Sequence, residues 1–190
     1  MRKRAVFLDR DGTLLEEANY IAEIERLVFF PFSADAVRLL NRAGLVVVVI
    51  TNQAGIARGI VDESFVGEAH AAISARLAEG GAHVDAYYYC PHHPQGIVDA
   101  YRRACDCRKP QPGMLRQAAG DLGIDLGASF VVGDKLTDIE AGHAVGARGV
   151  LVRTGYGRKE EALPDRRVQP DAIADNLMGA VSWILQAWPG

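Results

Sequence analysis

The stretch that decides the fold lies near the start of the chain and reads Ala5-Val6-Phe7-Leu8-Asp9-Arg10-Asp11-Gly12-Thr13. Its four apolar residues, Ala5–Leu8, predict a short buried strand that ends where the carboxylates begin. Asp9 and Asp11 are two residues apart as they leave this strand, so their side chains can point to the same side. Such a pair can divide catalytic work, with one carboxylate ionised as a nucleophile and the other protonated as a general acid. The plain alternative is an acidic surface turn, but Gly12 and Thr13 after a buried strand favour a built loop.

Outward from this stretch, apolar β-branched runs alternate with helical periodicity. This alternation predicts an α/β fold, with a Rossmann-like parallel sheet flanked by helices. The strands are expected at Ala5–Leu8, Leu45–Thr51, Ala86–Cys90, Ser129–Gly133 and Gly149–Val152, with a late edge strand at Asp171–Ile173. The helices are expected at Ser33–Ala43, Asp62–Glu79, Gly113–Asp121, Thr137–Val145 and Leu177–Trp188, with Trp183 and Trp188 as packing residues. The segments Leu14–Phe32, Cys90–Pro112 and Arg158–Pro170 fit neither period and are expected to be irregular.

Composition limits the function classes. The chain has 190 residues, with 21 Lys and Arg against 24 Asp and Glu and a formal charge of -3. The length predicts one domain spanning residues 1–190, and no feature calls for more than a monomer. The lack of a basic excess argues against a nucleic-acid partner. No apolar run reaches the ~20 residues of a membrane span, and the four apolar residues after Met1–Arg4 are too few for a signal peptide, so a cytoplasmic location without membrane contact is expected.

Further chemistry follows the other strands, and in open parallel sheets ligands bind beyond the carboxyl ends of the strands. Thr51 opens a glycine-containing loop whose hydroxyl, amide and backbone N–H groups can hold a phosphate, with Arg58 at its edge. Arg108 and Lys109 supply a planar fork and a point charge for phosphate oxygens. Asp134 and Asp138 suit Mg²⁺, which prefers oxygen ligands. Taken singly, each could be a polar turn, a solvated pair or a helix cap; their joint position at strand ends favours one site.

The three cysteines all fall in one window. Cys90 and His92 form one close pair, and Cys105 and Cys107 form another after a twelve-residue spacer that begins at His93. Three thiolates and one imidazole match a closed tetrahedral Zn²⁺ site of structural type, so a zinc-stabilised loop is predicted over residues 90–109. Spacing alone leaves His92 and His93 both open as the fourth ligand, with free buried thiols as the alternative to a metal. His70, His83 and His143 are expected to be structural.

The order of D-x-D-G-T, a later Thr, a later Lys and G-D-x-x-x-D resembles the four motifs of haloacid-dehalogenase-type (HAD) phosphatases. The resemblance implies that Asp9 forms an aspartyl-phosphate and that Asp11 acts as general acid and then base. It implies that Thr51 and Lys109 contact the phosphoryl group. It also implies that Mg²⁺ is held by Asp9, Asp134 and the carbonyl of Asp11, with Asp138 supporting it through water. No large cap domain is visible, so Leu14–Phe32 and the zinc loop are the only candidate lids.

Longer stretches narrow the resemblance. The segments T-N-Q-A-G-I-A-R-G, Y-Y-C-P-H-H-P-Q-G and C-D-C-R-K-P-x-P-G-M-L are similar to the family of D-glycero-D-manno-heptose 1,7-bisphosphate 7-phosphatases, which serve bacterial surface polysaccharide synthesis. This similarity favours His92 as zinc ligand and implies a phosphorylated sugar as substrate. The residues it places beside the substrate are Glu17, Ala18, Asn19, Tyr20, Thr51, Asn52, Gln53, Ala54, Gly55, Arg108, Lys109 and Lys135. The alternative is a histidinol-phosphate phosphatase, which is similar in the same motifs but carries a shorter zinc loop.

Overall fold

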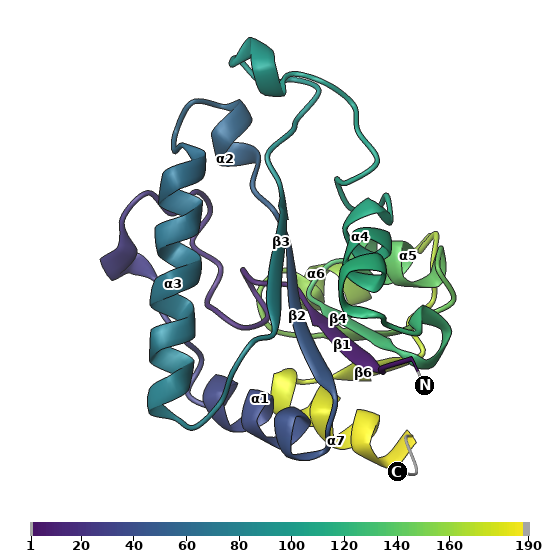
Figure 1. Ribbon diagram of the computed structural model, residues 1–190. Helices are drawn as coiled ribbons and strands as arrows, with labels where there is room; N and C mark the ends of the chain where they lie inside the picture. Colours follow the sequence, from purple (N-terminus) through teal and green to yellow (C-terminus); the bar gives the residue numbers. More distant parts are fainter. Residues whose placement is uncertain (1, 188–190) are drawn as a thin grey trace.

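A computed structural model of the chain describes residues 2–187. Its centre is a sheet of six parallel strands in the order β3-β2-β1-β4-β5-β6, which confirms the predicted α/β class (Figure 1). The strands are β1 (Ala5–Leu8), β2 (Val46–Asn52), β3 (Ala86–Cys90), β4 (Phe130–Gly133), β5 (Arg148–Val152) and β6 (Ala172–Ala174). Because β1 pairs with β2 on one side and β4 on the other, the strand order reverses there. Such a reversal is where open α/β sheets bind their ligands.

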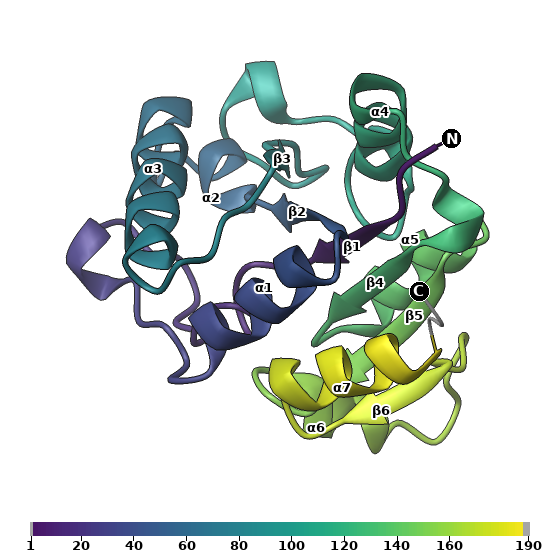
Figure 2. The same cartoon turned by 60° about the horizontal axis from the view of Figure 1, so that its bottom comes forward.

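Helices cover both faces of the sheet (Figure 2). The longer ones are α1 (Ser33–Arg42), α3 (Glu63–Glu79), α4 (Gly113–Leu122), α5 (Leu136–His143) and α7 (Leu177–Ala187), and the shorter ones are α2 (Ala54–Ala57) and α6 (Gly157–Glu161). Side chains of α1, α3 and α7 pack in one cluster, and those of α4 and α5 pack in another on the opposite face. None of the helices within residues 2–187 is long and apolar enough to cross a membrane.

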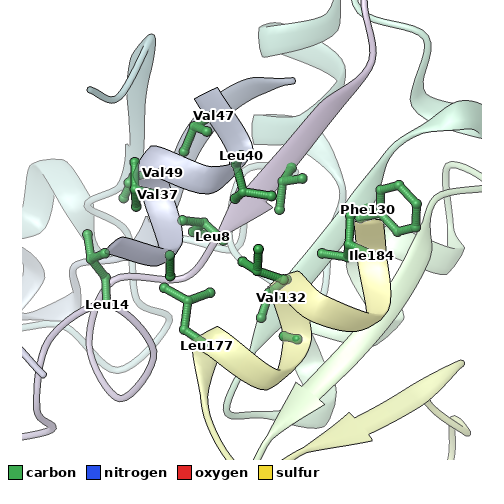
Figure 3. Packing of buried hydrophobic residues seen from close by; sticks show 14 of the residues in the cluster. Leu8, Leu14, Val37, Leu40, Val47, Val49, Phe130, Val132, Leu177 and Ile184 are labelled. Atoms are coloured by element: carbon green, nitrogen blue, oxygen red, sulfur yellow. The ribbon is translucent and has the colours of Figure 1, made fainter. Parts of the chain in front are cut away.

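The core follows from the two-residue period of the strands. Val6 and Leu8 of β1 enter the cluster with α1 and α7, whereas Ala5 and Phe7 enter the cluster with α4. Figure 3 shows Leu8 among side chains of neighbouring strands and of α1 and α7. All four β1 residues are fully buried, as a central parallel strand requires. The strand that precedes the two carboxylates is therefore held from both faces.

Several predicted boundaries need correction. Strand β2 runs from Val46 to Asn52, one residue later than expected, because its hydrogen-bond register with β1 begins at Val46 and its pairing with β3 continues to Asn52. The glycine-containing loop folds into α2, which was not predicted. The segment 158–170 was expected to be irregular, but it begins inside α6. Single 3-10 turns occur at Ile24–Arg26 and Asp99–Tyr101, within the two long loops.

The C-terminal predictions agree with the described part of the chain. Strand β6 pairs in parallel with β5 at the sheet edge. On α7, the ring of Trp183 packs edge-on against Phe130, and the guanidinium of Arg148 lies over both rings. The predicted role of Trp188 falls outside the described residues.

Candidate active site

A cavity of about 370 Å³ opens at the carboxyl edge of the sheet, and it collects most of the residues that the sequence singled out. Its walls come from the ends of β1, β2 and β4, from the start of the first long loop and from the end of the zinc loop. The described residues that line it are Asp9, Asp11, Glu17, Asn19, Tyr20, Ile21, Thr51, Asn52, Gln53, Ala54, Gly55, Val61, Arg108, Lys109, Lys135, Thr137, Asp138 and Tyr156. Three residues that were expected at the site, Ala18, Arg58 and Asp134, are not among the described residues that line the cavity. The guanidinium of Arg58 instead lies over the ring of Tyr20, 5.7 Å from its centroid.

The charge centre of the cavity is Lys109, which is buried between two carboxylates. Its ammonium lies 2.6 Å from Asp9 Oδ1 and 2.6 Å from Asp138 Oδ1, and it donates to the carbonyl of Ile50 at 2.9 Å. Burial opposes its charge, but the carboxylates of Asp138 and Asp9 outweigh this and raise the pKa of Lys109. The lysine is therefore a permanent cation directly beside the predicted nucleophile.

Asp134 is built into a tight pocket under the loop after β1. Its Oδ2 accepts a hydrogen bond from the backbone N–H of Tyr156 at 2.8 Å. Gly12 (φ 89°) and Gly155 (φ 54°) both press against its carboxylate, and a Cβ on either would collide with it. Burial, together with the charges of Asp9 and Asp138, raises the pKa of Asp134 to about 8. Three crowded carboxylates of this kind need a cation between them.

The carboxylates of Asp9, Asp134 and Asp138 fit that need. Their oxygen atoms lie within 4.8 Å of one another, and in the described part of the chain Asp134 Oδ1 is buried without a hydrogen-bond partner. Asp138 is more fully engaged, because its Oδ1 meets Lys109 and its Oδ2 accepts from the backbone N–H of Lys135 at 3.1 Å. A hard divalent cation such as Mg²⁺ would complete the coordination of an orphaned carboxylate oxygen. Asp134 and Asp9 are thus better placed as direct ligands than Asp138.

Asp11 lies at the cavity wall next to Gln53. The Gln53 amide nitrogen donates to Asp11 Oδ2 at 3.1 Å and to Thr51 Oγ1 at 2.8 Å. Because the Thr51 oxygen accepts this bond, its own proton is free to point into the cavity toward an anion. One amide thus orients both the predicted acid and the predicted phosphate-binding hydroxyl.

Asn52 lines the cavity, as expected, and also holds the main chain of Lys109. Its Nδ2 donates to the carbonyl of Lys109 at 3.1 Å, and its Oδ1 accepts from the Lys109 backbone N–H at 3.0 Å. Both amide atoms therefore hold the main chain at Lys109, and each keeps one further N–H or lone pair. The neighbouring Arg108 donates from Nη1 to the carbonyl of His92 at 3.3 Å, which links it to the cysteine cluster.

The cysteine cluster forms as the spacing predicted. Cys107 Sγ lies 3.0 Å from Cys90 Sγ and 3.2 Å from Cys105 Sγ, and the last two sulfur atoms are 3.5 Å apart. No disulfide joins the three cysteines. His92 Nδ1 lies 3.3 Å from Cys107 Sγ and 3.8 Å from Cys90 Sγ. His93 is turned away, because its Nδ1 accepts from the N–H of Gln95. These separations approach the ~3.7 Å edge of a tetrahedron with ~2.3 Å Zn–S bonds, so the four groups could hold zinc.

The segment after β5 contributes a cavity residue that sequence reasoning missed. The ring of Tyr156 lies under the ammonium of Lys135, 4.5 Å from the centroid, and its hydroxyl contacts Asn19 Oδ1 at 3.3 Å. Lys135 also faces Glu17 at 3.6 Å, and burial raises the pKa of Glu17 against the opposing charge of that lysine. Thr154 Oγ1 donates to the carbonyl of Gly12 at 2.6 Å. The rule that ligands bind beyond strand ends could have found this segment, since it follows β5.

The remaining histidines lie outside the cavity. His70 is buried on α3 and stacks on Tyr87 at 4.5 Å, and burial lowers its pKa to about 4. His143 contacts Asp171 at 2.8 Å, and His83 lies 3.8 Å from Asp85. None of these three histidines is among the described residues that line the cavity, and their structural role stays a prediction.

These features together define a HAD-type phosphatase. They are a parallel sheet, paired aspartates after β1, a buried lysine, and carboxylates after β4. A family model described as HAD-hydrolase-like matches residues 106–180. The chain is 48% identical over 160 residues to the D-glycero-β-D-manno-heptose-1,7-bisphosphate 7-phosphatase of Escherichia coli (strain K12), which covers 83% of each chain. It is 43% identical over 173 residues to the protein of the same name from Photorhabdus laumondii, which covers 90% of this chain and 92% of that one.

A solved structure agrees with these relatives. The D,D-heptose 1,7-bisphosphate phosphatase of B. bronchiseptica, in complex with magnesium and phosphate, superposes with a TM-score of 0.84 at 33% identity, over 97% of this chain and 99% of that one. The chain belongs to the family of D-glycero-β-D-manno-heptose-1,7-bisphosphate 7-phosphatases.

Proposed function

We propose that residues 1–190 act as one phosphatase domain that removes the C7 phosphate of D-glycero-D-manno-heptose 1,7-bisphosphate and releases heptose 1-phosphate. The observation that carries this proposal is the joint presence of Asp9, Asp11, Thr51 and Lys109 at one cavity, in a chain nearly half identical to a phosphatase of that name. No finding favours the histidinol-phosphate alternative. The product would feed the synthesis of nucleotide-activated heptose for lipopolysaccharide.

The chemistry proceeds in two balanced steps. Asp9 attacks phosphorus, a bond forms between its carboxylate oxygen and phosphorus, and the bond to the sugar oxygen breaks. Asp11 gives its proton to that leaving oxygen, so the product is a neutral alcohol. Asp11 then takes a proton from water as the water attacks phosphorus, which frees Asp9 and inorganic phosphate. Asp11 is thereby returned to its protonated form.

The surrounding residues stabilise this reaction electrostatically. The ammonium of Lys109 offsets the repulsion between a carboxylate and a phosphate dianion, and the Thr51 hydroxyl donates to a phosphoryl oxygen. A bound Mg²⁺, held by Asp9, Asp134 and the carbonyl of Asp11, with Asp138 nearby, would supply Lewis-acid stabilisation of the transferred group. The magnesium and phosphate in the B. bronchiseptica structure support this assignment.

A bisphosphate fits the distribution of charge in the cavity. Lys109 lies at the reacting end, whereas Arg108 and Lys135 line the wall and can face the sugar and its second phosphate. The loop residues Glu17, Asn19 and Tyr20 also line the cavity, with Glu17 3.6 Å from Lys135. The cavity lies between two loops without a cap domain, so it can accept an extended sugar.

The cysteine cluster supports the site through the loop it folds. Zinc held by Cys90, His92, Cys105 and Cys107 would fix the loop immediately before Arg108 and Lys109. The bond from Arg108 to the His92 carbonyl and the two bonds from Asn52 to Lys109 pass that order to the cavity. We therefore assign zinc a structural role and Mg²⁺ the catalytic one.

The proposal is tested by kcat/KM in Mg²⁺ for heptose 1,7-bisphosphate and histidinol phosphate. A 3′-phosphorylated oligonucleotide represents the nucleic-acid substrates that the composition argues against. We expect the heptose to be preferred, with loss of the C7 and not the C1 phosphate in ³¹P NMR spectra. Asp9→Asn should abolish turnover and keep the fold, whereas the control Asp35→Asn on α1 should behave as wild type. A preference for histidinol phosphate, or substantial activity of the Asp9 variant, would refute the proposal.

A further inference from the structure

Arg10 is a buried charge that the mechanism above does not use. It stands between Asp9 and Asp11, is 3% exposed, and is not among the described residues that line the cavity. A guanidinium taken out of water costs free energy unless a partner compensates it. Its position directly after a buried strand, behind the catalytic loop, therefore calls for an explanation.

The partner of Arg10 is the carboxylate of Asp11. Nε lies 3.1 Å from Oδ1 and 3.0 Å from Oδ2, and Nη2 lies 2.8 Å from Oδ2. Gln53 adds a third donor to Oδ2 at 3.1 Å. Because the planar guanidinium contacts both oxygens, the Asp11 carboxylate cannot rotate about its Cβ–Cγ bond without losing these contacts.

The contacts divide the two oxygens of Asp11 unequally. Oδ2 receives Nε, Nη2 and the Gln53 amide, whereas Oδ1 receives Nε alone. Oδ1 is therefore the oxygen with free lone-pair capacity, and Asp11 is a cavity-lining residue. An acid that must hand a proton to a leaving oxygen and later take one from water needs one such oxygen in a fixed direction.

We propose that Arg10 is a positioning residue, which holds the Asp11 carboxyl from behind so that Oδ1 faces the leaving oxygen and then the attacking water. The inference rests on the proposed phosphatase function and adds a residue to it. Arg10 acts through Asp11 and does not touch substrate. The alternative is that Arg10 only stabilises the fold as a buried counterion.

Leaving-group dependence separates these two roles. Protonation by Asp11 matters for a poor leaving group and little for p-nitrophenolate, which departs unprotonated. We expect Arg10→Met to lower kcat/KM about 100-fold for phenyl phosphate and for heptose bisphosphate, within the ~10²–10⁴-fold worth of general acid catalysis, and less than about 5-fold for p-nitrophenyl phosphate. Arg10→Lys, which keeps the charge without the planar fork, should lose about 10-fold on phenyl phosphate and fold normally.

A double-mutant cycle gives the second readout. If Arg10 acts only through Asp11, Arg10→Lys should have no further effect in an Asp11→Asn background. Arg38→Gln on α1, where Arg38 binds the Gly80 carbonyl, is the control for loss of a partly buried arginine and should keep wild-type activity. Equal losses of Arg10→Lys on both aryl phosphates, additive effects with Asp11→Asn, or wild-type activity of Arg10→Lys would each overturn the proposal. The aryl substrates do not depend on the heptose assignment, so failure of that assignment would appear separately, as lack of turnover of the bisphosphate.

Discussion

Gly155 offers a way to disturb the cation site without touching a reacting group. It has a φ of 54°, and a Cβ placed on it would lie 2.7 Å from the Gly12 Cα and 3.0 Å from Asp134 Cγ. Gly12 belongs to the loop that contains Asp9 and Asp11. Gly155→Ala should therefore push Asp134 and the catalytic loop apart.

The magnitude follows from two costs. A left-handed backbone costs an alanine roughly 1–2 kcal/mol, and overpacking a filled site typically costs a further ~1–3 kcal/mol. The control is Gly44→Ala, since Gly44 has a φ of 75° and a Cβ there would meet no described atom within 4 Å. Gly44→Ala should lose roughly 1–2 kcal/mol, and Gly155→Ala should lose about 2–5 kcal/mol.

Urea denaturation at constant slope measures both losses, and a Mg²⁺ titration of kcat tests the site. We expect Gly155→Ala to need at least about 10-fold more Mg²⁺ for half-maximal activity, because Asp134 is displaced, and Gly44→Ala to need the wild-type concentration. If the two variants have equal stability and equal Mg²⁺ dependence, the reasoning about contact between Gly155 and Asp134 is refuted.

Four further predictions concern the cavity and the cysteine cluster. Lys109→Met should lower the free energy of unfolding by ~3–5 kcal/mol, because it leaves buried carboxylates unpaired, while Lys159→Met on the surface changes it little in the same urea titration. The pKa of Asp134 is raised from its ordinary value of 3.8 to about 8, so between these pH values, and without divalent cations, the folded protein binds more protons than the unfolded chain. The free energy of unfolding, measured by urea denaturation, should therefore fall as pH rises from about 4 to about 8. Saturating Mg²⁺ should remove this decline. Tyr156→Leu should raise KM about 2–5-fold with little change in kcat, because it removes the cation–π contact with Lys135, which is worth ~0.5–1 kcal/mol. Tyr156→Phe keeps the ring and should retain most of the affinity. Equal KM values for the two variants would contradict this. Elemental analysis should find about one zinc per chain, and its removal should lower the melting temperature and raise KM; a zinc-free preparation of full activity would exclude the structural role.

The strands and the main site residues could be predicted because each depends on local sequence. The apolar stretch before Asp9 predicts a buried strand, and strand ends in a parallel sheet meet at one edge, so Thr51 and Asp134 were expected there. The close pairs of the cysteine cluster fix its members through short spacing. These features are encoded within a few residues and need only the sheet to bring them together.

The features that escaped prediction depend on contacts between distant segments. Tyr156 enters the site because β5 runs parallel to β4, and no local pattern marks it as a partner of Asn19. Asn52 was expected to border substrate and does line the cavity, but its bond to the main chain of Lys109, 57 residues away, was not expected. Arg58 was expected to add charge at the site; it does not line the cavity itself, but its guanidinium lies over the ring of Tyr20, which does. Side-chain direction in loops follows from tertiary packing, which the sequence pattern does not contain.

The order of strands has a consequence for how such a protein can change. The proposed nucleophile follows β1, the proposed phosphate-binding hydroxyl lies at the end of β2, the proposed cation ligand follows β4, and the segment that contacts it follows β5. Their relative placement is thus inherited from the register of the sheet, whereas Glu17, Asn19 and Tyr20 at the cavity rim belong to a loop outside the sheet. New sugars could be accommodated by exchanging rim residues such as Glu17, Asn19 and Tyr20. Leu14 and Leu15 of the same loop must stay, because they are buried in the core and hydrogen-bonded to Arg10 and Gly12 of the catalytic loop.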